Sequence, residues 1–270
     1  MTSAYSDVLE RIQAGIDAAK KIFGRYTPGE IAAEYKAGND PVTEADRELD
    51  VALRQKLLRD GEGWLSEESA DDLSRLNCER VWVVDPLDGA REFVAGIPEF
   101  CVSIALVEGG QPVAGGICNP ATDEVFLGSI DSGLTYNGAP ARVAQRDKLE
   151  GALVLASRSE TNRGEWQKFR DAPFTAQPTG SVAYKLARVA AGRADATFTL
   201  TPKHEWDIAG GAALVMSGGG FARPLDSPFA WNGKIPRVKG FIACGDLLKH
   251  DLLEFLIPYM PEKTAIKNLL

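Results

Sequence analysis

Residues 81–93 read Val81-Trp82-Val83-Val84-Asp85-Pro86-Leu87-Asp88-Gly89-Ala90-Arg91-Glu92-Phe93. The β-branched beginning predicts a buried strand, and the glycine predicts a turn that leads into a helix. Asp85 and Asp88 would leave this strand together, so a turn could aim both carboxylates and the Leu87 carbonyl at one hard cation. Free amides at the start of the helix could face a phosphate. The alternative is a turn in which both aspartates only cap backbone amides.

Three other segments carry carboxylates in comparable settings. Glu67 lies in Ser66-Glu67-Glu68-Ser69, which alone would suit a solvated acidic turn. Asp207 precedes an apolar helical stretch, where it could serve only as a helix cap. Asp46 lies in the first turn of another expected helix, where a negative charge responds to the helix dipole. Each segment on its own therefore has a structural explanation as well as a catalytic one.

Apolar spacing predicts the elements around these segments. Intervals of three and four residues indicate helices at 6–26 and 43–57, the second with a capped start. Strands are expected at residues 81–84, 102–107, 113–118 and 125–127, followed by a hairpin turn at Asn137-Gly138. Strand and helix patterns then alternate at residues 153–156, 181–191, 194–200, 208–216, 241–243 and 247–257. This alternation predicts an α/β architecture.

The chain length suits one large domain or two closely packed halves, because 270 residues can bury a substantial core. The polar segment at residues 145–150 is the expected join. We therefore expect an N-terminal α+β half, residues 1–147, with most of the metal ligands. A C-terminal α/β half, residues 148–270, would carry Asp207 and the substrate-side residues, and the halves would pack as one catalytic unit.

Composition limits the partners and the location. A formal net charge of −8 without a basic cluster argues against a nucleic-acid polymer, although cations held by carboxylates would still allow a small phosphorylated substrate. No apolar run is long enough to cross a bilayer, and Met1 to Asp7 lack the pattern of a secretory signal. Four widely spaced cysteines favour free thiols in a reducing compartment. We expect a cytoplasmic protein without a membrane partner.

Several common active-site plans are missing from the sequence. Only two histidines are present, His204 and His250, which is too few for an all-histidine metal site. The thiolate phosphate-transfer loop, the Asp-x-Asp of aspartyl-phosphate enzymes, the Gly-x-Ser-x-Gly elbow and the Gly-x-x-x-x-Gly-Lys loop are also absent. The carboxylates therefore remain as the candidates for catalysis.

Taken together, the carboxylate segments resemble those of the inositol monophosphatase superfamily of metal-dependent, lithium-sensitive phosphatases. The resemblance covers nearly the whole chain and rests on Val42-Thr43-Glu44-Ala45-Asp46, Glu67-Glu68-Ser69, Asp85-Pro86-Leu87-Asp88-Gly89, residues 133–138, Gly180-Ser181 and Trp206-Asp207-Ile208-Ala209-Gly210. It implies an α/β fold, the layered αβαβα sandwich of the inositol monophosphatase and fructose-1,6-bisphosphatase type. It also implies two or three Mg²⁺ ions, inhibition by Li⁺ and, by analogy, a homodimer.

The resemblance also assigns roles to individual residues. The side-chain metal ligands would be Glu67, Asp85, Asp88 and Asp207, joined by the Leu87 carbonyl. Beside Asp88, the backbone amides of Gly89 and Ala90 would hold the phosphate. Bound cations would neutralise phosphate oxygens and activate water, so no covalent intermediate is required.

Ala90 departs from the family's usual motif, which has Thr at this position. In the family, the Thr hydroxyl is tied to the aspartate that corresponds to Asp46, and it helps to orient the attacking water beside the glutamate that corresponds to Glu67. Ala keeps the amide but loses this contact, and one such contact can change a rate about a hundred-fold. A slower enzyme, a compensating group elsewhere and a catalytically silent form are all open.

The substrate side resembles the CysQ-type 3′(2′),5′-bisphosphate nucleotidases more than the inositol enzymes, because of Arg91-Glu92-Phe93 and Glu205. Leu200 stands where inositol enzymes carry a Glu for sugar hydroxyls. Gly180-Ser181 and Lys185 resemble the loop and helix with which those nucleotidases meet a second phosphate, and Arg158 would assist. Both cations have an alternative as solvated surface charges.

The leading hypothesis is a Mg²⁺-dependent phosphomonoesterase. It would convert 3′-phosphoadenosine 5′-phosphate, or a related phosphorylated nucleotide, to AMP and phosphate by metal-activated water. The first alternative is an inositol monophosphatase or a sugar (bis)phosphatase of the same family. The second is a metal- and nucleotide-binding protein that no longer turns over, and the third is a structural protein whose acidic segments are only caps and turns.

Overall fold

A seven-stranded sheet forms the larger β-layer of the protein. The computed structural model describes residues 4–35, 41–225 and 229–260. The strand order is β3-β4-β5-β6-β7-β8-β9, in which β3 and β4 are parallel and the other neighbours are antiparallel. The strands are β3 (Gly63–Ser66), β4 (Arg80–Asp88), β5 (Cys101–Glu108), β6 (Gln111–Asn119), β7 (Glu124–Ser129), β8 (Gly133–Tyr136) and β9 (Ala139–Ala141).

A five-stranded sheet in the order β11-β10-β12-β16-β14 forms the second β-layer. Its strands are β10 (Leu153–Ser157), β11 (Thr175–Thr179), β12 (Ala196–Thr199), β14 (Gly220–Pro224) and β16 (Phe241–Gly245). β10 pairs in parallel with β11 and β12, whereas β16 is antiparallel to β12 and β14. Two short ladders complete the strands: β1 (Glu34–Tyr35) with β2 (Pro41–Val42), and β13 (Lys203–His204) with β15 (Arg237–Val238).

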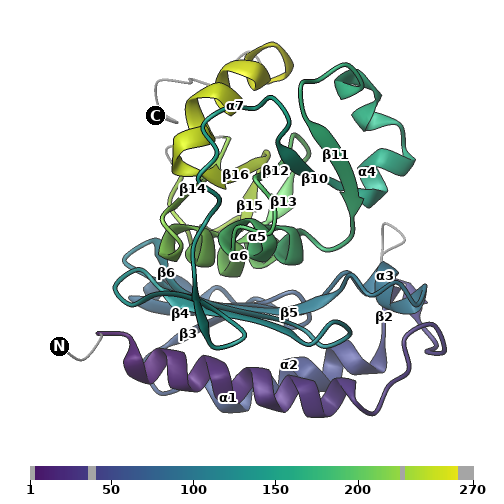
Figure 1. Ribbon diagram of the computed structural model, residues 1–270. Helices are drawn as coiled ribbons and strands as arrows, with labels where there is room; N and C mark the ends of the chain where they lie inside the picture. Colours follow the sequence, from purple (N-terminus) through teal and green to yellow (C-terminus); the bar gives the residue numbers. More distant parts are fainter. Residues whose placement is uncertain (1–3, 36–40, 226–228, 261–270) are drawn as a thin grey trace.

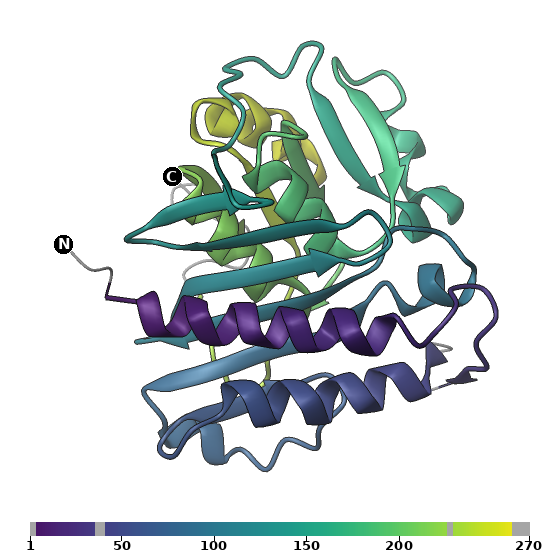
Figure 2. The ribbon, with the colours of Figure 1, turned by 60° about the horizontal axis from the view of Figure 1, so that its bottom comes forward.

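Helices alternate with the two sheets in layers (Figure 1, Figure 2). α1 (Ser6–Phe23) and α2 (Glu44–Leu57) cover one face of the larger sheet, and α5 (Val182–Ala190) and α6 (Glu205–Ser217) lie between the sheets. α7 (Lys249–Leu256) lies beyond the smaller sheet. The short helices are α3 (Ala90–Val94) and α4 (Arg158–Asn162), with 3-10 turns at η1 (Ser74–Asn77), η2 (Glu165–Phe169), η3 (Asp246–Leu248) and η4 (Ile257–Tyr259). The predicted layered αβαβα sandwich is therefore confirmed.

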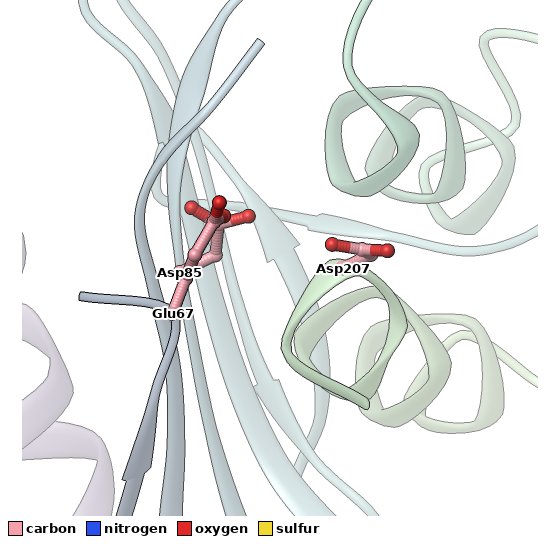
Figure 3. A group of neighbouring side chains, drawn as sticks. All are labelled: Glu67, Asp85 and Asp207. Atoms are coloured by element: carbon pink, nitrogen blue, oxygen red, sulfur yellow. The ribbon is translucent and has the colours of Figure 1, made fainter. Parts of the chain in front are cut away.

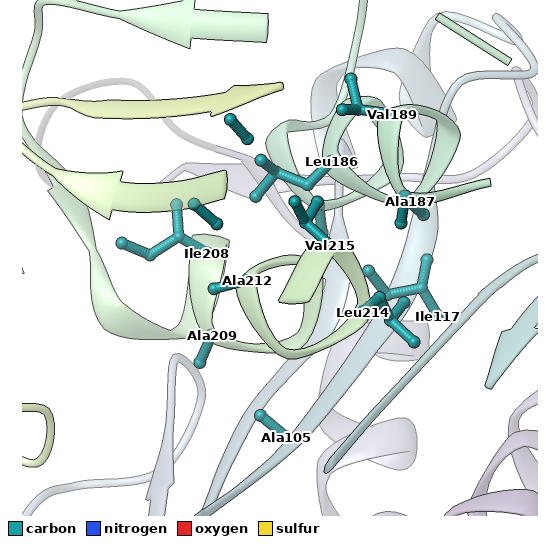
Figure 4. Close-up of a cluster of buried hydrophobic side chains, with 14 of the residues drawn as sticks. Ala105, Ile117, Leu186, Ala187, Val189, Ile208, Ala209, Ala212, Leu214 and Val215 are labelled. Carbon is teal, nitrogen blue, oxygen red and sulfur yellow. The ribbon is translucent and has the colours of Figure 1, made fainter. Parts of the chain in front are cut away.

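Apolar side chains fill the spaces between these layers. α1 and α2 bury Ile12, Ile16 and Leu49 against the larger sheet. Between the sheets, α5 and α6 pack around side chains such as Leu186 and Ala212 (Figure 4). Burial of this apolar surface is the main favourable term in folding. It holds α6 against the larger sheet, in which Asp85 and Asp88 lie at the end of β4.

Glycines allow α6 to lie directly on the larger sheet. A Cβ added at Gly115 of β6 would lie 2.6 Å from the Gly210 carbonyl oxygen of α6, and one added at Gly210 would lie 2.6 Å from Ser103 Oγ. Side chains do not approach so closely, so a larger residue here would push the helix away from the sheet. Because α6 carries Asp207 in its first turn, this contact sets how far that carboxylate lies from the sheet.

Gly115→Ala is expected to lower the free energy of unfolding by about 1–3 kcal/mol, because the added methyl group overpacks a backbone contact. The displaced helix should also weaken Mg²⁺ binding, measured as a smaller rise of Tm on adding Mg²⁺. Gly24→Ala is the control, since Gly24 is exposed and has a helical φ of −62°. An unchanged Tm and Mg²⁺ response in Gly115→Ala would contradict this account of the contact.

A buried ion pair fastens α1 to the larger sheet. Arg11 is 5% exposed, and its Nη1 donates to Glu62 Oε1 at 3.0 Å. Trp82 Nε1 donates to Glu62 Oε2 at 2.8 Å, and the Arg11 guanidinium lies 4.8 Å from the centroid of the Trp82 ring. Burial acts to raise the pKa of Glu62, but the hydrogen bonds from Arg11 and Trp82 outweigh it, so the pKa lies below its usual value.

Glu62→Gln is expected to destabilise the protein by about 3–5 kcal/mol at neutral pH, because it leaves the Arg11 charge buried without its partner. Because the pKa of Glu62 is lowered in the folded protein, the ion pair contributes its full stabilisation above the ordinary Glu pKa of about 4.3. This stabilisation is lost as the pH falls through the lower pKa of the folded state. Thermal melts of the two proteins should therefore converge in acid. Glu34→Gln, which breaks an exposed pair with Arg47, should change little. A constant difference in Tm between wild type and Glu62→Gln over the whole pH range would refute the stabilising role of the ionised Glu62.

Most predicted elements are present, and their differences from the structure lie at their ends. The helix expected at residues 6–26 ends at Phe23, and the strand expected at 81–84 continues to Asp88. The turn at Asn137-Gly138 joins β8 to β9, and both residues have positive φ values, 47° and 77°. Strand β11 was not predicted, because it is an edge strand with mostly exposed side chains and carries no apolar alternation.

The chain passes from the larger to the smaller sheet between Ala141 and Leu153, a stretch that includes the predicted join. The boundary at 147/148 stays a prediction, and the ends of the two proposed halves, 1–3 and 261–270, lie outside the described residues, as do the first three residues of the segment examined for a secretory signal. All four cysteines are free, as predicted, and Cys78 alone among them is half-buried. Across residues 4–35, 41–225 and 229–260, no helix combines the length and the apolar character of a membrane span.

Candidate metal and phosphate site

A bulge at the end of β4 places Asp85 and Asp88 at one pocket. Asp85 pairs with Ser103 and Asp88 with Cys101, so three steps along β4 match two steps along β5. In a regular strand, residues three apart face opposite sides, and the extra residue brings them back to the same side. Pro86 lies within this irregular stretch, where a missing N–H costs no ladder hydrogen bond. Asp85 Oδ1 also accepts a hydrogen bond from Leu87 N at 3.0 Å.

Glu67 follows β3, whose parallel pairing with β4 aligns the carboxyl ends of the two strands. Ser66 lies opposite Val84, and Glu67 N donates to Val84 O at 3.4 Å. Asp50 of α2 braces this segment, because it accepts hydrogen bonds from the hydroxyls of Ser66 and Ser69, both at 2.5 Å. Asp50 was not predicted from the sequence, although the two serines that flank Glu67-Glu68 were a signal of such a brace.

Asp207 completes a group of three carboxylates from three separate elements (Figure 3). It lies in the first turn of α6 and accepts a hydrogen bond from His204 N at 2.9 Å in a capping box. One ligand atom from each of Glu67, Asp85 and Asp207 lies within 4.8 Å of the others. In Figure 3, Glu67 and Asp85 lie together at the sheet, and Asp207 lies across from them at the start of the helix. Asp207 is thus both a cap and a member of the cluster.

Asp88 and Asp46 line the same pocket but lie outside this group of three. Asp88 Oδ2 accepts hydrogen bonds from Ser181 Oγ at 2.7 Å and Ala183 N at 2.6 Å, which ties the end of β4 to the start of α5. Asp46 Oδ2 accepts from both the amide and the hydroxyl of Thr43, at 2.7 and 2.6 Å. Asp46 therefore closes a capping box at the start of α2 as well as facing the pocket.

The chemistry of this donor set suits divalent metal ions. Burial raises the pKa of Asp85 well above its usual range, and repulsion from Glu67 and Asp88 adds to it. Burial, followed by repulsion from Asp88 and Glu67, raises the pKa of Asp207 to about 8. Carboxylates held this closely need positive charge between them to stay ionised together, and oxygen ligands are those that Mg²⁺ prefers. The residues present therefore fit the metal ions that the sequence implies.

Both halves of the chain line one pocket of about 370 Å³ around the carboxylates. From the first half, the pocket receives the predicted site residues Asp46, Glu67, Asp85, Leu87, Asp88, Gly89 and Ala90. From the second half, it receives Arg158, Ser181, Lys185 and Asp207, all of which were also predicted. Gly89 has a φ of 94°, and an added Cβ would lie 2.7 Å from Glu99 O, so only glycine suits the turn beside the carboxylates.

The predicted substrate cations are both held by the protein. Lys185 is 4% exposed, so its alternative as a surface charge is wrong, and its Nζ donates to Ser181 O at 2.8 Å. Burial lowers the pKa of Lys185 to about 8. Arg158 Nη2 donates to Glu99 Oε2 at 2.6 Å, and Gly180 N donates to the same oxygen at 2.5 Å. Arg158 and Glu99 thus position the turn before α5.

Two of the sequence features that favoured a nucleotide lie away from the pocket lining. Glu205 is fully buried and accepts hydrogen bonds from Asn232 N at 2.7 Å and Gly233 N at 3.1 Å. Leu200 packs against the core on the outer face of the smaller sheet. Neither residue lines the pocket in the described part of the chain, so the likeness at these positions does not reflect a contact with substrate.

Several pocket residues were not predicted from the sequence. Lys203 and His204 precede α6, and the His204 and Trp206 rings stack with centroids 4.5 Å apart and an interplanar angle of 14°. The start of α4 adds Ser157 and Ser159, and the residue after its end adds Arg163. The proximity of Lys203 and His204 to Asp207 in the sequence was their only signal, and the α4 residues had none.

Comparison with known proteins agrees with this arrangement. A model of the inositol monophosphatase family matches residues 4–262. An inositol-1-monophosphatase of Mesorhizobium japonicum is 35% identical over 227 residues, 80% of this chain and 84% of the relative. The solved structure of the IMPase of Thermotoga maritima has a TM-score of 0.78 at 28% identity and covers 91% of this chain and 96% of its own. That of CysQ from Bacteroides thetaiotaomicron has a TM-score of 0.74 at 26% identity and covers 90% and 98%.

Proposed function

Because the chain belongs to the inositol monophosphatase family of metal-dependent phosphatases, we propose that it is a Mg²⁺-dependent phosphomonoesterase that acts on a phosphorylated nucleotide. The observation that carries the proposal is the convergence of Glu67, Asp85 and Asp207 from three elements within 4.8 Å. Caps and turns alone would not bring these three carboxylates together, because their mutual repulsion opposes it. A structural protein without a ligand is therefore not a competing explanation.

The residues around the cluster have distinct roles in this reaction. Divalent cations held by Glu67, Asp85, Asp88, Asp207 and the Leu87 carbonyl would neutralise phosphate oxygens and make water a stronger nucleophile at neutral pH. Glu67 accepts a proton from the attacking water. The amides of Gly89 and Ala90 hold the phosphate in place, and the hydrogen bonds from Ser181 and Ala183 fix the Asp88 carboxylate beside it.

A phosphorylated nucleotide such as 3′-phosphoadenosine 5′-phosphate is the proposed substrate. The Arg91-Glu92 pair after the phosphate turn supports it, as does the buried Lys185 near Asp88, whose charge favours a further anionic group in the pocket. The stacked His204 and Trp206 rings add an aromatic surface of the kind on which nucleobases stack. The likeness to the CysQ structure agrees with this choice.

An inositol phosphate is the second candidate, favoured by the 35% identity to a protein named inositol-1-monophosphatase. Leu200, which replaces the Glu of the inositol enzymes, does not decide against this candidate, because it packs against the core of the smaller sheet and lies outside the pocket lining.

A panel of phosphate esters tests both candidates. Phosphate release should be fastest from 3′-phosphoadenosine 5′-phosphate, should require Mg²⁺ and should be inhibited by Li⁺. A preference for inositol 1-phosphate or fructose 1,6-bisphosphate would refute the nucleotide assignment and keep the enzyme class. Release from none of them, with Mg²⁺ and nucleotide still bound in calorimetry, would favour the protein without turnover.

A cytoplasmic location and a homodimer stay predictions. Cell fractionation checks the location. The molar mass of the full chain, measured by light scattering after size-exclusion chromatography, checks the homodimer.

A further inference from the structure

Cationic side chains line the pocket together with the carboxylate cluster. These are Arg91, Arg158, Arg163, Lys185 and Lys203. A phosphate held at the cluster does not need all of these charges, so some of them are available for another part of the substrate. Which of them can bind it depends on the partners that each already has.

Four of the five cations are engaged by the protein itself. Arg158 is hydrogen-bonded to Glu99 at 2.6 Å, and Arg163 Nε donates to Glu165 Oε1 at 2.6 Å. Lys185 Nζ donates to Ser181 O, and Arg91 is not free either.

Lys203 differs from these four. Its Nζ lies 3.6 Å from Glu160 Oε1, an ion pair that is longer than a hydrogen bond. Within residues 4–35, 41–225 and 229–260, it donates no hydrogen bond to another side chain or to the backbone. Lys203 lines the pocket, and its side chain is only 18% exposed, so its three N–H donors have limited access to water.

Glu160 pairs with the charge of Lys203 without accepting a hydrogen bond from it. Its Oε1 accepts hydrogen bonds from Thr199 Oγ1 at 2.6 Å and Thr201 Oγ1 at 2.8 Å, and its Oε2 accepts one from Trp166 Nε1 at 3.3 Å. Burial acts to raise the pKa of Glu160, but these hydrogen bonds and the charge of Lys203 lower it overall, so the carboxylate is ionised. A fixed negative charge therefore orients the ammonium group and leaves its donors for a ligand.

Lys203 also shares a second, smaller cavity with Lys185. This cavity lies between α5 and β12 and is lined by both lysines. Both lysines also line the main pocket, and besides burial the charge of Lys203 acts to lower the pKa of Lys185, so the two charges repel each other. An anion with two negative charges relieves that repulsion. A phosphate group meets this need better than a hydroxyl or a single carboxylate.

We propose that Lys203, oriented by Glu160, binds a second phosphate group of the substrate while the first lies at the carboxylate cluster. The inference rests on the proposed function, because it assigns the other end of the same substrate. It predicts a selectivity for bisphosphorylated over monophosphorylated esters that depends on this one side chain.

The test compares 3′-phosphoadenosine 5′-phosphate with adenosine 3′-phosphate, which lacks the second phosphate. In Lys203→Met, the ratio of the two kcat/KM values should fall about 10- to 100-fold, mainly through the KM of the bisphosphate, because a charge-assisted hydrogen bond is lost. Lys203→Arg should restore most of the ratio. Arg163→Met is the matched control, since Arg163 lines the pocket but is paired with Glu165, and its ratio should stay within about twofold.

An equal loss of kcat/KM for both substrates in Lys203→Met would overturn the proposal. It would indicate instead that the charge of Lys203 serves to keep Asp207 ionised. An unchanged ratio would overturn it as well. If wild type hydrolyses neither ester, the proposed function fails, and calorimetry of 3′-phosphoadenosine 5′-phosphate in the presence of Ca²⁺ still decides the inference. Weaker binding by Lys203→Met than by wild type then supports it, and equal binding refutes it.

Discussion

Asp85→Asn is expected to abolish phosphate release and, at the same time, to raise the melting temperature of the metal-free protein. Asp85 is 2% exposed and lies within a cluster whose other members are Glu67 and Asp207. Losing a central metal ligand should lower kcat/KM about a thousand-fold or more, because the metal ions supply several kcal/mol of transition-state stabilisation. Burial and mutual repulsion raise the pKa values of Asp85 and Asp207, so the metal-free fold opposes their ionisation, and removing the Asp85 carboxylate should stabilise it by about 1–2 kcal/mol. Asn keeps the oxygen that accepts the hydrogen bond from Leu87 N.

Thermal melts with EDTA and with excess Mg²⁺ measure both parts of this prediction. Wild type should gain stability from Mg²⁺, and Asp85→Asn should not, because only the folded site binds the ion. Asp195→Asn is the control, since Asp195 is a largely buried carboxylate of the second half that is paired with Arg146. That variant should lose stability and keep its response to Mg²⁺. An Asp85→Asn protein that still releases phosphate at the wild-type rate would exclude the cluster as the catalytic centre.

Ala90→Thr is expected to raise kcat about 10- to 100-fold with little change in KM. Ala90 lines the pocket with Asp46 and Glu67, so a hydroxyl at this position would lie among the groups that orient the attacking water. One positioned polar contact at a reacting centre has an effect of about this size. KM should change little because the amide of residue 90, which holds the phosphate, is the same in both proteins.

Ala90→Val separates the hydroxyl from the added volume. Valine has the shape of threonine without the oxygen, so it should give no gain and, because Ala90, the first residue of α3, packs against the core, a small loss of stability. A gain in Ala90→Thr alone would assign the effect to the hydroxyl. Equal rates in wild type and Ala90→Thr would mean that another group already positions the water. A wild type without turnover that gains activity in Ala90→Thr would identify this chain as a silenced binding protein.

The sequence predicted much of the fold because the relevant patterns are local. The continuous apolar runs of β5 and β6, the apolar stripe of α1 and the capped start of α2 depend on neighbours within one turn or one strand. The αβαβα order and the roles of Glu67, Asp85, Asp88 and Asp207 came from a resemblance that joins four such local motifs. The described structure confirms the layered fold, and it brings Glu67, Asp85 and Asp207 together.

The sequence by itself determined which residue types lie at the ends of which strands and helices. Only the tertiary structure decided how they meet. The bulge between Asp85 and Asp88 depends on pairing with β5, and the distance of Asp207 from the sheet depends on the contact between Gly115 and Gly210. The buried role of Glu205 and the unoccupied donors of Lys203 likewise depend on partners far along the chain. The spacing of residues along a sequence fixes the face of a helix or strand on which each side chain lies. The distances between helices and strands come from their packing, which no single segment encodes.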